Sequence, residues 1–221
     1  MSRLCKAPGC GARTKTFGRY CNRHHSHMRR HGAADQQAIT VTELKPFRKL
    51  VKARIERNAE NPLWANSEAN WRAVVDHAKG ILAAFQRGRA GFRFERLAAE
   101  EVVRLAEHVE PREVCEMVWA LYLLEDSDPH RFRSGTAFRA QLVRRVRGLT
   151  RSNAGQWKDA ATGRVKVAYR ELSPKVAATM AGWIVQALGG VGVLLARLER
   201  QQREEKQRRA EVMAEAVKEL R

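Results

Sequence analysis

The sequence has little negative charge for its length. Its 221 residues include 24 aspartates and glutamates against 42 lysines and arginines, a formal net charge of +18. No acidic residue precedes Asp35, and Asp159 is the single acid between Arg131 and Arg170. A surface of this sign attracts polyanions, so the composition favours nucleic acid, or an anionic membrane, as the partner.

Cysteine is also scarce, and its distribution argues against a disulfide framework. Three of the four cysteines lie near the N-terminus, and Cys115 stands alone in an apolar helical run. The N-terminus has no apolar segment that would serve as a secretory signal. We therefore expect a reducing cytoplasmic location, with the clustered cysteines as metal ligands and Cys115 as an inert core thiol.

The first 33 residues lack the apolar side chains that a core of their own would need. Their large apolar side chains are Leu4, Phe17, Tyr20 and Met28. A metal ion can take the place of a core, because four protein ligands around structural zinc supply roughly 10 kcal/mol or more of folding free energy. The prediction is a structural zinc ion with no open coordination position.

The spacing of possible ligands is Cys-x4-Cys-x10-Cys-x2-His. Cys5 and Cys10 flank a Pro-Gly pair, which favours a tight turn and lets both sulfurs face one point. Two half-sites of this kind are typical of zinc-binding modules.

The second half-site begins at Cys21, in a segment that predicts a short helix ending at Gly32. His24 and His25 follow Cys21 by three and four residues, so both share its helical face, whereas His27 points away. The spacing alone leaves His24 and His25 open as the fourth ligand.

The segments CKAPGC and RYCNRHHSHMRRHG resemble the small Cys/His zinc-binding module found at the N-terminus of many phage and mobile-element proteins, often ahead of an HNH endonuclease domain. That module reads C-x-x-x-G-C, then G-[YL]-C-x-x-H-Y, then R-x-R-R-H-G. The resemblance covers residues 5–32, and the chain departs from the pattern at Arg19, His25 and Ser26-His27. It implies DNA as the partner, a basic helix end at Arg29, Arg30 and His31, and the zinc ligands Cys5, Cys10, Cys21 and His24.

The residues of a nuclease centre do not follow the module. An HNH nuclease needs a second cluster, with a His general base and further ligands for a divalent metal. Beyond His31 the sequence has only His77, His108 and His130, each isolated in its element. It also lacks a phosphate-binding glycine loop, a nucleophile elbow and a kinase signature. A non-catalytic protein is therefore favoured, and a relative of HNH-type nucleases is the weaker alternative.

The rest of the chain predicts a mainly α-helical fold, in which a helical bundle follows the zinc-binding module. Apolar residues at helical period mark helices in residues 42–61, from a cap at Ser67 to Phe85, and in residues 98–108 and 111–125. The predicted domains are the zinc-binding module (1–33), a basic linker helix (34–61), a helical domain (62–196) and a charged C-terminal helix (197–221).

A basic helix is predicted, capped near Ser134 or Thr136. Its apolar face would pack on the core, and its arginine face would contact the phosphates of a nucleic acid. The alternation around Thr162-Gly163 then predicts a short basic β-hairpin, so this part favours a winged-helix-like arrangement. We expect the module and this region to contact separate stretches of nucleic acid, DNA in preference to RNA. The predicted contacts are Arg13, Lys15, Arg19, Arg23, Arg29, Arg30, Arg139, Arg144, Arg145, Arg147, Arg151, Arg164 and Lys166.

Residues 176–196 carry no charge and are long enough to cross a bilayer. The Gly189-Gly190 pair predicts a turn, so two shorter buried helices are expected and a membrane segment is the alternative. This apolar region and the charged helix after it are also the expected contacts for protein partners.

The leading hypothesis is a cytoplasmic, zinc-stabilised nucleic-acid-binding protein of phage or mobile-element type. The alternative is a DNA-reading subunit of a larger nucleoprotein complex. In its general layout the chain is similar to subunits of RNA-guided effectors of the type IV CRISPR kind.

Overall fold

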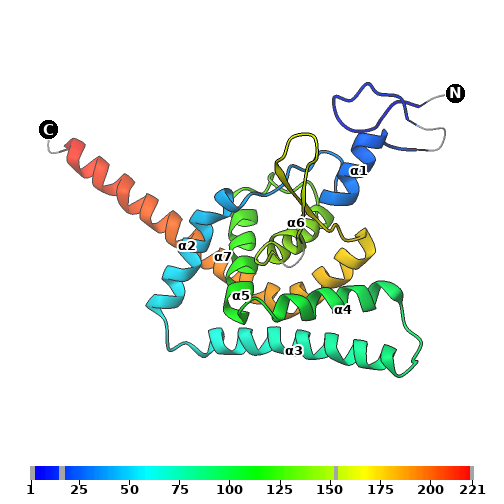
Figure 1. Ribbon diagram of the computed structural model, residues 1–221. Helices are drawn as coiled ribbons and strands as arrows, with labels where there is room; N and C mark the ends of the chain where they lie inside the picture. The colour runs from blue at the N-terminus through cyan, green and yellow to red at the C-terminus, as the bar shows by residue number, and fades with distance from the viewer. Residues whose placement is uncertain (1–2, 15–17, 152–153, 220–221) are drawn as a thin grey trace.

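The computed structural model describes residues 3–14, 18–151 and 154–219, and it is mainly α-helical (Figure 1). These residues form a bundle of seven helices and one two-stranded antiparallel sheet. The elements in chain order are α1 (Asn22–His31), α2 (Val41–Arg57), α3 (Pro62–Gln86), α4 (Arg93–Ala106), α5 (Pro111–Ser127), α6 (Gly135–Arg147), β1 (Ala154–Lys158), β2 (Val165–Tyr169) and α7 (Pro174–Glu219).

Several helices begin and end where the sequence predicts, because local groups satisfy their free backbone ends. α1 ends at Gly32 in the left-handed conformation, with φ of 82°. Thr40 and Glu43 form a capping box at the start of α2. Ser134, one of the two predicted caps, accepts a hydrogen bond from the backbone N–H of Ala137 at the start of α6.

α3 begins earlier than predicted. Its cap is Asn61, whose side chain accepts a hydrogen bond from the N–H of Leu63, and Pro62 is its first residue. The predicted cap, Ser67, is buried inside the helix and donates its hydroxyl to the Leu63 carbonyl. The prediction was wrong because the Asn-Pro pair is the start of the helix and not only the break before it. α4 likewise begins at Arg93, ahead of its predicted start.

α5 is the centre of the helical core. Every residue from Val114 to Leu124 is buried, and the helix packs against α2, α3, α6 and α7. The Trp119 ring lies against Trp64 of α3, with ring centroids 5.7 Å apart. Burial of each large apolar side chain stabilises the fold by about 1.5–3 kcal/mol, so this layer supplies much of the stability.

Cys115 lies in this buried run, as the sequence predicts, with no exposed surface. Burial raises the pKa of its thiol to about 12. The sulfur is therefore protonated at neutral pH and behaves as a small apolar side chain, because the thiolate is the reactive form.

Helix α2, the predicted linker, belongs to the same core. Leu44, Val51 and Ile55 are buried in it, along α5. Arg54 is also buried, and its guanidinium pairs with Glu199 of α7 at an Nη2–Oε1 distance of 2.6 Å. This ion pair joins the end of α2 to the last helix of the chain.

α7 is one continuous helix, so the predicted turn at Gly189-Gly190 is wrong. A Cβ on Gly189 would lie 2.7 Å from the Tyr122 hydroxyl oxygen, and one on Gly192 would lie 2.4 Å from the Tyr122 ring. These glycines therefore admit Tyr122 of α5 into close contact with α7. Glycine in a helix is less favourable than alanine by about 1 kcal/mol, a loss that this packing offsets.

The two parts of α7 differ in burial. Val176, Met180, Ile184 and Leu188 are buried against the bundle, whereas residues 200–215 are exposed and extend away from it (Figure 1). In the described part of the chain, α7 is the one helix long and apolar enough to cross a membrane, and 39% of its most apolar window is buried inside the protein.

Between α6 and α7, β1 and β2 pair antiparallel, with Lys158 opposite Val165. In the turn, the Asp159 carboxylate accepts hydrogen bonds from the backbone N–H groups two and three residues later, at 2.9 and 3.2 Å. Gly163 adopts φ of 66°, which suits glycine. Contact between these strands and nucleic acid stays a prediction.

The segment that leads from α1 to α2 is held against the loop between α5 and α6. The buried Gln36 amide donates to the carbonyl of Arg131 and accepts from the N–H of Arg133, at 3.2 and 3.0 Å. Arg131 in turn donates to the Ala38 carbonyl at 3.0 Å and pairs with Glu43. These bonds place α1 beside α6.

Alanine at Gly192 is expected to destabilise the protein, because its Cβ would overlap the Tyr122 ring. Overpacking of this kind costs about 1–3 kcal/mol. Gly190 is the matched control, since a Cβ there meets no atom within 4 Å, and Gly190→Ala should raise the melting temperature through helix propensity. Thermal unfolding followed by circular dichroism compares the two variants. Equal melting temperatures would contradict the close contact.

Candidate metal centre and basic groove

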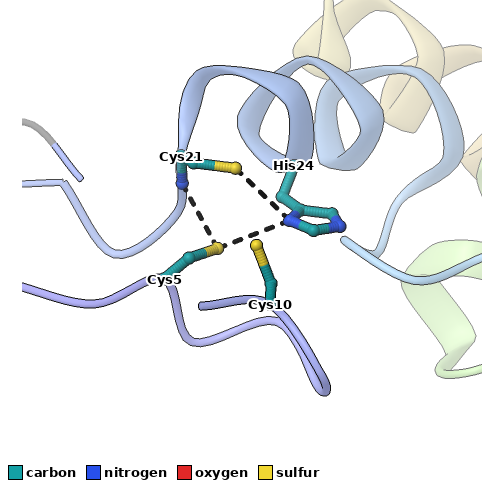
Figure 2. A group of neighbouring side chains, drawn as sticks. All are labelled: Cys5, Cys10, Cys21 and His24. Atoms are coloured by element: carbon teal, nitrogen blue, oxygen red, sulfur yellow. Dashed lines mark hydrogen bonds between the residues drawn. The ribbon is translucent and has the colours of Figure 1, made fainter. Parts of the chain in front are cut away.

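A tight turn presents the first two cysteines. The N–H of Cys5 donates to the Ala12 carbonyl at 2.9 Å, and the N–H of Cys10 donates to the Ala7 carbonyl at 3.1 Å. Gly9 between them has φ of 70°, which glycine adopts without strain. This local fold brings both sulfurs to one side of the turn (Figure 2).

The start of α1 presents the other two ligands. Cys21 is the N-cap of α1, and its N–H donates to Sγ of Cys5 at 3.3 Å. His24 directs Nδ1 to Sγ of Cys5 and of Cys21, at 3.4 Å from each. The ligand atoms of Cys5, Cys10, Cys21 and His24 all lie within 4.8 Å of one another (Figure 2). The four predicted ligands therefore converge, and they could hold a metal ion.

The distances fit a tetrahedral ion. With bonds of about 2.3 Å to sulfur and 2.0–2.1 Å to nitrogen, neighbouring ligand atoms in a tetrahedron lie roughly 3.5–3.8 Å apart. Both Sγ–Nδ1 distances of His24 are close to this value. Four protein ligands around one ion would leave no coordination position for a substrate.

The thiols of this cluster affect one another's ionisation. Burial raises the pKa of Cys5, but hydrogen bonds from the backbone of Cys21 and Ala7 and from His24 outweigh it and lower the pKa to about 6. For Cys10, the Ala12 backbone lowers the pKa, but burial and the neighbouring sulfurs outweigh it, so the pKa is raised. Ionisation of one thiol therefore makes ionisation of the next less favourable, and a bound cation would offset this repulsion between thiolates.

The other histidines of α1 lie outside the cluster. His25 is exposed and is not part of the cluster, so the histidine that joins the three cysteines is His24. The ring of His27 lies against that of His31, with centroids 4.5 Å apart and the planes tilted by 38°. His31, which the resemblance placed in the basic helix end, is buried instead, and burial together with nearby positive charge lowers its pKa to about 4. It is therefore neutral at physiological pH.

His31 and Gly32 dock α1 onto α6. Nδ1 of His31 lies 3.0 Å from Nε2 of the buried Gln141, whose Oε1 accepts from the N–H of Ile39 at 3.0 Å. A Cβ on Gly32 would lie 2.6 Å from the Thr136 carbonyl oxygen. Glycine at this position therefore serves both the turn and the close approach of the two helices.

A groove of about 800 Å³ lies between α1, α6 and the start of α7. We call it the basic groove, since among the described residues that line it Glu171 is the one acid beside several arginines. The two basic regions of the sequence, expected to contact separate stretches of nucleic acid, meet here on one surface. The arginines are Arg29, Arg30, Arg139, Arg144, Arg145, Arg147 and Arg170.

Arg147 and Arg30 have partners inside the protein. The guanidinium of Arg147 is largely buried and donates to Glu101 at 2.9 Å and to the Arg170 carbonyl at 2.8 Å. Burial lowers the pKa of Arg147, while Glu101 opposes that shift. Arg30 pairs with Glu171 at 2.6 Å. Arg147 therefore holds the end of the hairpin against α4 and α6. The helical pattern predicts that Arg147 faces solvent, and this prediction was wrong, because its guanidinium is largely buried.

Other arginines of the groove carry uncompensated charge. Arg29 and Arg139 are exposed, and within the described chain neither has an ion pair. Nε of Arg144 is buried and has no hydrogen-bond partner among the described residues. An anion in the groove would supply the missing partner.

The remaining predicted contacts are either outside the description or outside the groove. Lys15 lies outside the described residues, and Lys166 belongs to β2 but its side chain lies outside the description. The others are exposed elsewhere on the surface: Arg13, Arg19, Arg23, Arg151 and Arg164.

Sequence reasoning missed part of the groove. His25, Met28 and Val41 line it, as do Arg170 and Glu171. Met28 and Val41 are apolar but 42% and 59% exposed. The one signal in the sequence is that these large apolar residues lie in segments otherwise rich in polar side chains.

Comparisons of the chain with models of protein families, with curated proteins and with solved structures gave no match. The fold and the site therefore define its class directly. It is a mainly helical protein with an N-terminal Cys/His cluster that could hold a metal ion.

Replacing His24 by alanine is expected to reduce bound metal well below one ion per chain, because it removes one of four ligands. His25→Ala is the matched control and should retain the ion, since His25 lies outside the cluster. Elemental analysis of both purified variants gives the stoichiometry. Full occupancy in His24→Ala, or loss in His25→Ala, would contradict the assignment of the fourth ligand.

Proposed function

We propose that the protein is a non-catalytic, zinc-stabilised protein that binds nucleic acid in the cytoplasm. The observation that supports this best is the basic groove, where arginines from α1 and α6 face one cavity with a single acidic neighbour among the described lining residues. Uncompensated arginines in a concave surface raise the local concentration of polyanions.

Zinc is the ion we assign to the cluster. Three thiolates and one imidazole in a tetrahedral arrangement suit zinc better than the harder divalent cations, which prefer oxygen ligands. The ion would fold the module and so fix α1. Its role is structural, since all four positions belong to the protein.

Binding rests on phosphate contacts. Arg29, Arg139 and Arg144 would each donate two hydrogen bonds to a phosphate, a geometry that the planar guanidinium favours. The resemblance of the N-terminal segment to modules of phage and mobile-element proteins favours DNA as the natural partner. Most of the affinity would be electrostatic, and added salt would weaken it.

A second candidate function is that of a subunit in a larger nucleoprotein complex. The extended part of α7 supports it, because Val212, Met213 and Val217 are 54–67% exposed on one helix. Apolar side chains in such a position are often covered by another protein. Recovery of the tagged protein with a defined RNA and other subunits would support this role, and purification as a lone monomer would count against it.

Removing a groove arginine is expected to weaken nucleic-acid binding and to reduce its salt dependence. Arg139→Ala and Arg144→Ala should each lower the slope of log K against log salt by about 0.7–0.9, the value for one phosphate contact. Arg87→Ala is the charge-matched control, exposed at the end of α3 and outside the groove. Fluorescence anisotropy across a salt series measures the slopes. Equal losses in all three variants would show that the groove is not the binding site.

Glu171→Gln is expected to strengthen binding severalfold at low salt. Glu171 pairs with Arg30 and competes with a phosphate for that guanidinium, so the neutral amide frees one more cation. Glu107→Gln, exposed and outside the groove, makes the same change in net charge as a control. The same anisotropy titration compares them. An equal gain in both variants would mean that net charge alone, and not this pair, sets the affinity.

A further inference from the structure

We infer that the basic groove binds single-stranded nucleic acid, with an unstacked base against its apolar lining and the flanking phosphates on its arginines. This inference rests on the proposed function and specifies the form of nucleic acid. The groove is lined both by arginines and by apolar side chains, and phosphate binding accounts only for the arginines.

The apolar lining is the part that phosphates do not explain. Met28 of α1, Val143 of α6 and Leu172 and Ala177 at the start of α7 line the groove together. Val143 is 3% exposed and lies at its base, whereas Met28 is 42% exposed on its wall. A site that contacts only a sugar-phosphate backbone gains nothing from a concave apolar surface, but the face of a base does.

The size of the groove agrees with this occupant. Its volume of about 800 Å³ lies within the roughly 300–1,000 Å³ of sites that enclose small organic ligands. Bases in a regular duplex are stacked and paired, so they cannot enter such a cavity without being flipped out. Single strands present their bases freely, and proteins read them by stacking and apolar contact.

The charged groups are placed to hold the phosphates on either side of a base. Arg29 lies on α1 and Arg139 and Arg144 lie on α6, so cations from two helices line the same groove as the apolar side chains. The buried Nε of Arg144 has no hydrogen-bond partner among the described residues. Guanidinium planes also stack on bases, as the exposed ring of His25 can.

An acidic amphipathic peptide would also combine charge with apolar groups. Nucleic acid is favoured because seven of the described residues that line the groove are arginines and only one is an acid. A polymer with one negative charge at each unit can neutralise several of these cations at once.

The test measures the affinity of the full-length, metal-loaded protein for four labelled ligands by fluorescence anisotropy. These are an oligothymidylate, an oligouridylate, a duplex of equal length, and an oligothymidylate of equal length in which abasic units replace several bases. The inference predicts that either single strand binds more tightly than the duplex. It also predicts that the abasic strand binds about tenfold more weakly than the intact one, because it lacks bases that would contact the apolar lining.

A protein variant gives an independent measure. Ala178→Leu adds apolar bulk at an exposed position in the groove without changing charge, and it should weaken single-strand binding more than duplex binding. Ala73→Leu, exposed on α3 and outside the groove, is the matched control. Melting temperatures close to that of the parent protein establish that both variants are folded.

The possible outcomes separate this inference from the proposed function. Equal binding of intact and abasic strands, or duplex binding as tight as single-strand binding, would overturn the inference and leave nucleic-acid binding in place. Absence of binding to all four ligands would overturn the proposed function itself. Binding of polyglutamate as tight as that of the oligothymidylate would also overturn the inference, because it would identify the groove as a site for acidic peptides.

Discussion

The docking of α1 onto α6 is the contact on which the rest of the site depends. Gly32 brings the end of α1 against the α6 backbone, and the neutral ring of His31 meets the buried amide of Gln141. A charged imidazole would lose its hydration at this position without gaining an opposite charge, which is why burial and nearby arginines lower its pKa. The Cys/His cluster at the start of α1 and the groove at its end are therefore parts of one rigid element.

Net charge overstates the cationic surface that is open to a partner. Arg147 is neutralised by Glu101 and Arg54 by Glu199, both in largely buried pairs. Such pairs position elements of the fold, because removing one member would leave an uncompensated buried charge. Among the described residues, some arginines without an ion pair, such as Arg139, line the groove. Burial and pairing thus separate arginines that stabilise the fold from arginines whose charge is open to solvent, a division that sequence counts cannot make.

The Cys/His cluster could be predicted from sequence because its ligands lie within one short segment, from Cys5 to His24, whose turn and helix are set by local residues. The groove could not, since it depends on the packing of α1 against α6 and on Gln141, far along the chain from His31. The helical class followed from apolar periodicity. The turn predicted at Gly189-Gly190 was wrong because the sequence does not distinguish a turn from a place where a large side chain, here Tyr122 against Gly189, must fit.

The two walls of the groove differ in what stabilises them. The α6 wall rests on the main core through residues such as Leu142 and Val146, whereas the module behind the α1 wall has a small cluster of buried side chains, among them Cys5 and Ala7. A segment with so little apolar burial depends on its ligands for order. If the cluster lost its ion, the α6 arginines would persist and continue to attract polyanions, but the cavity between two walls would not. A bound metal would therefore govern the shape of the site more than its charge, and under the proposed function the selectivity among nucleic acids would depend on the ion more strongly than the affinity would.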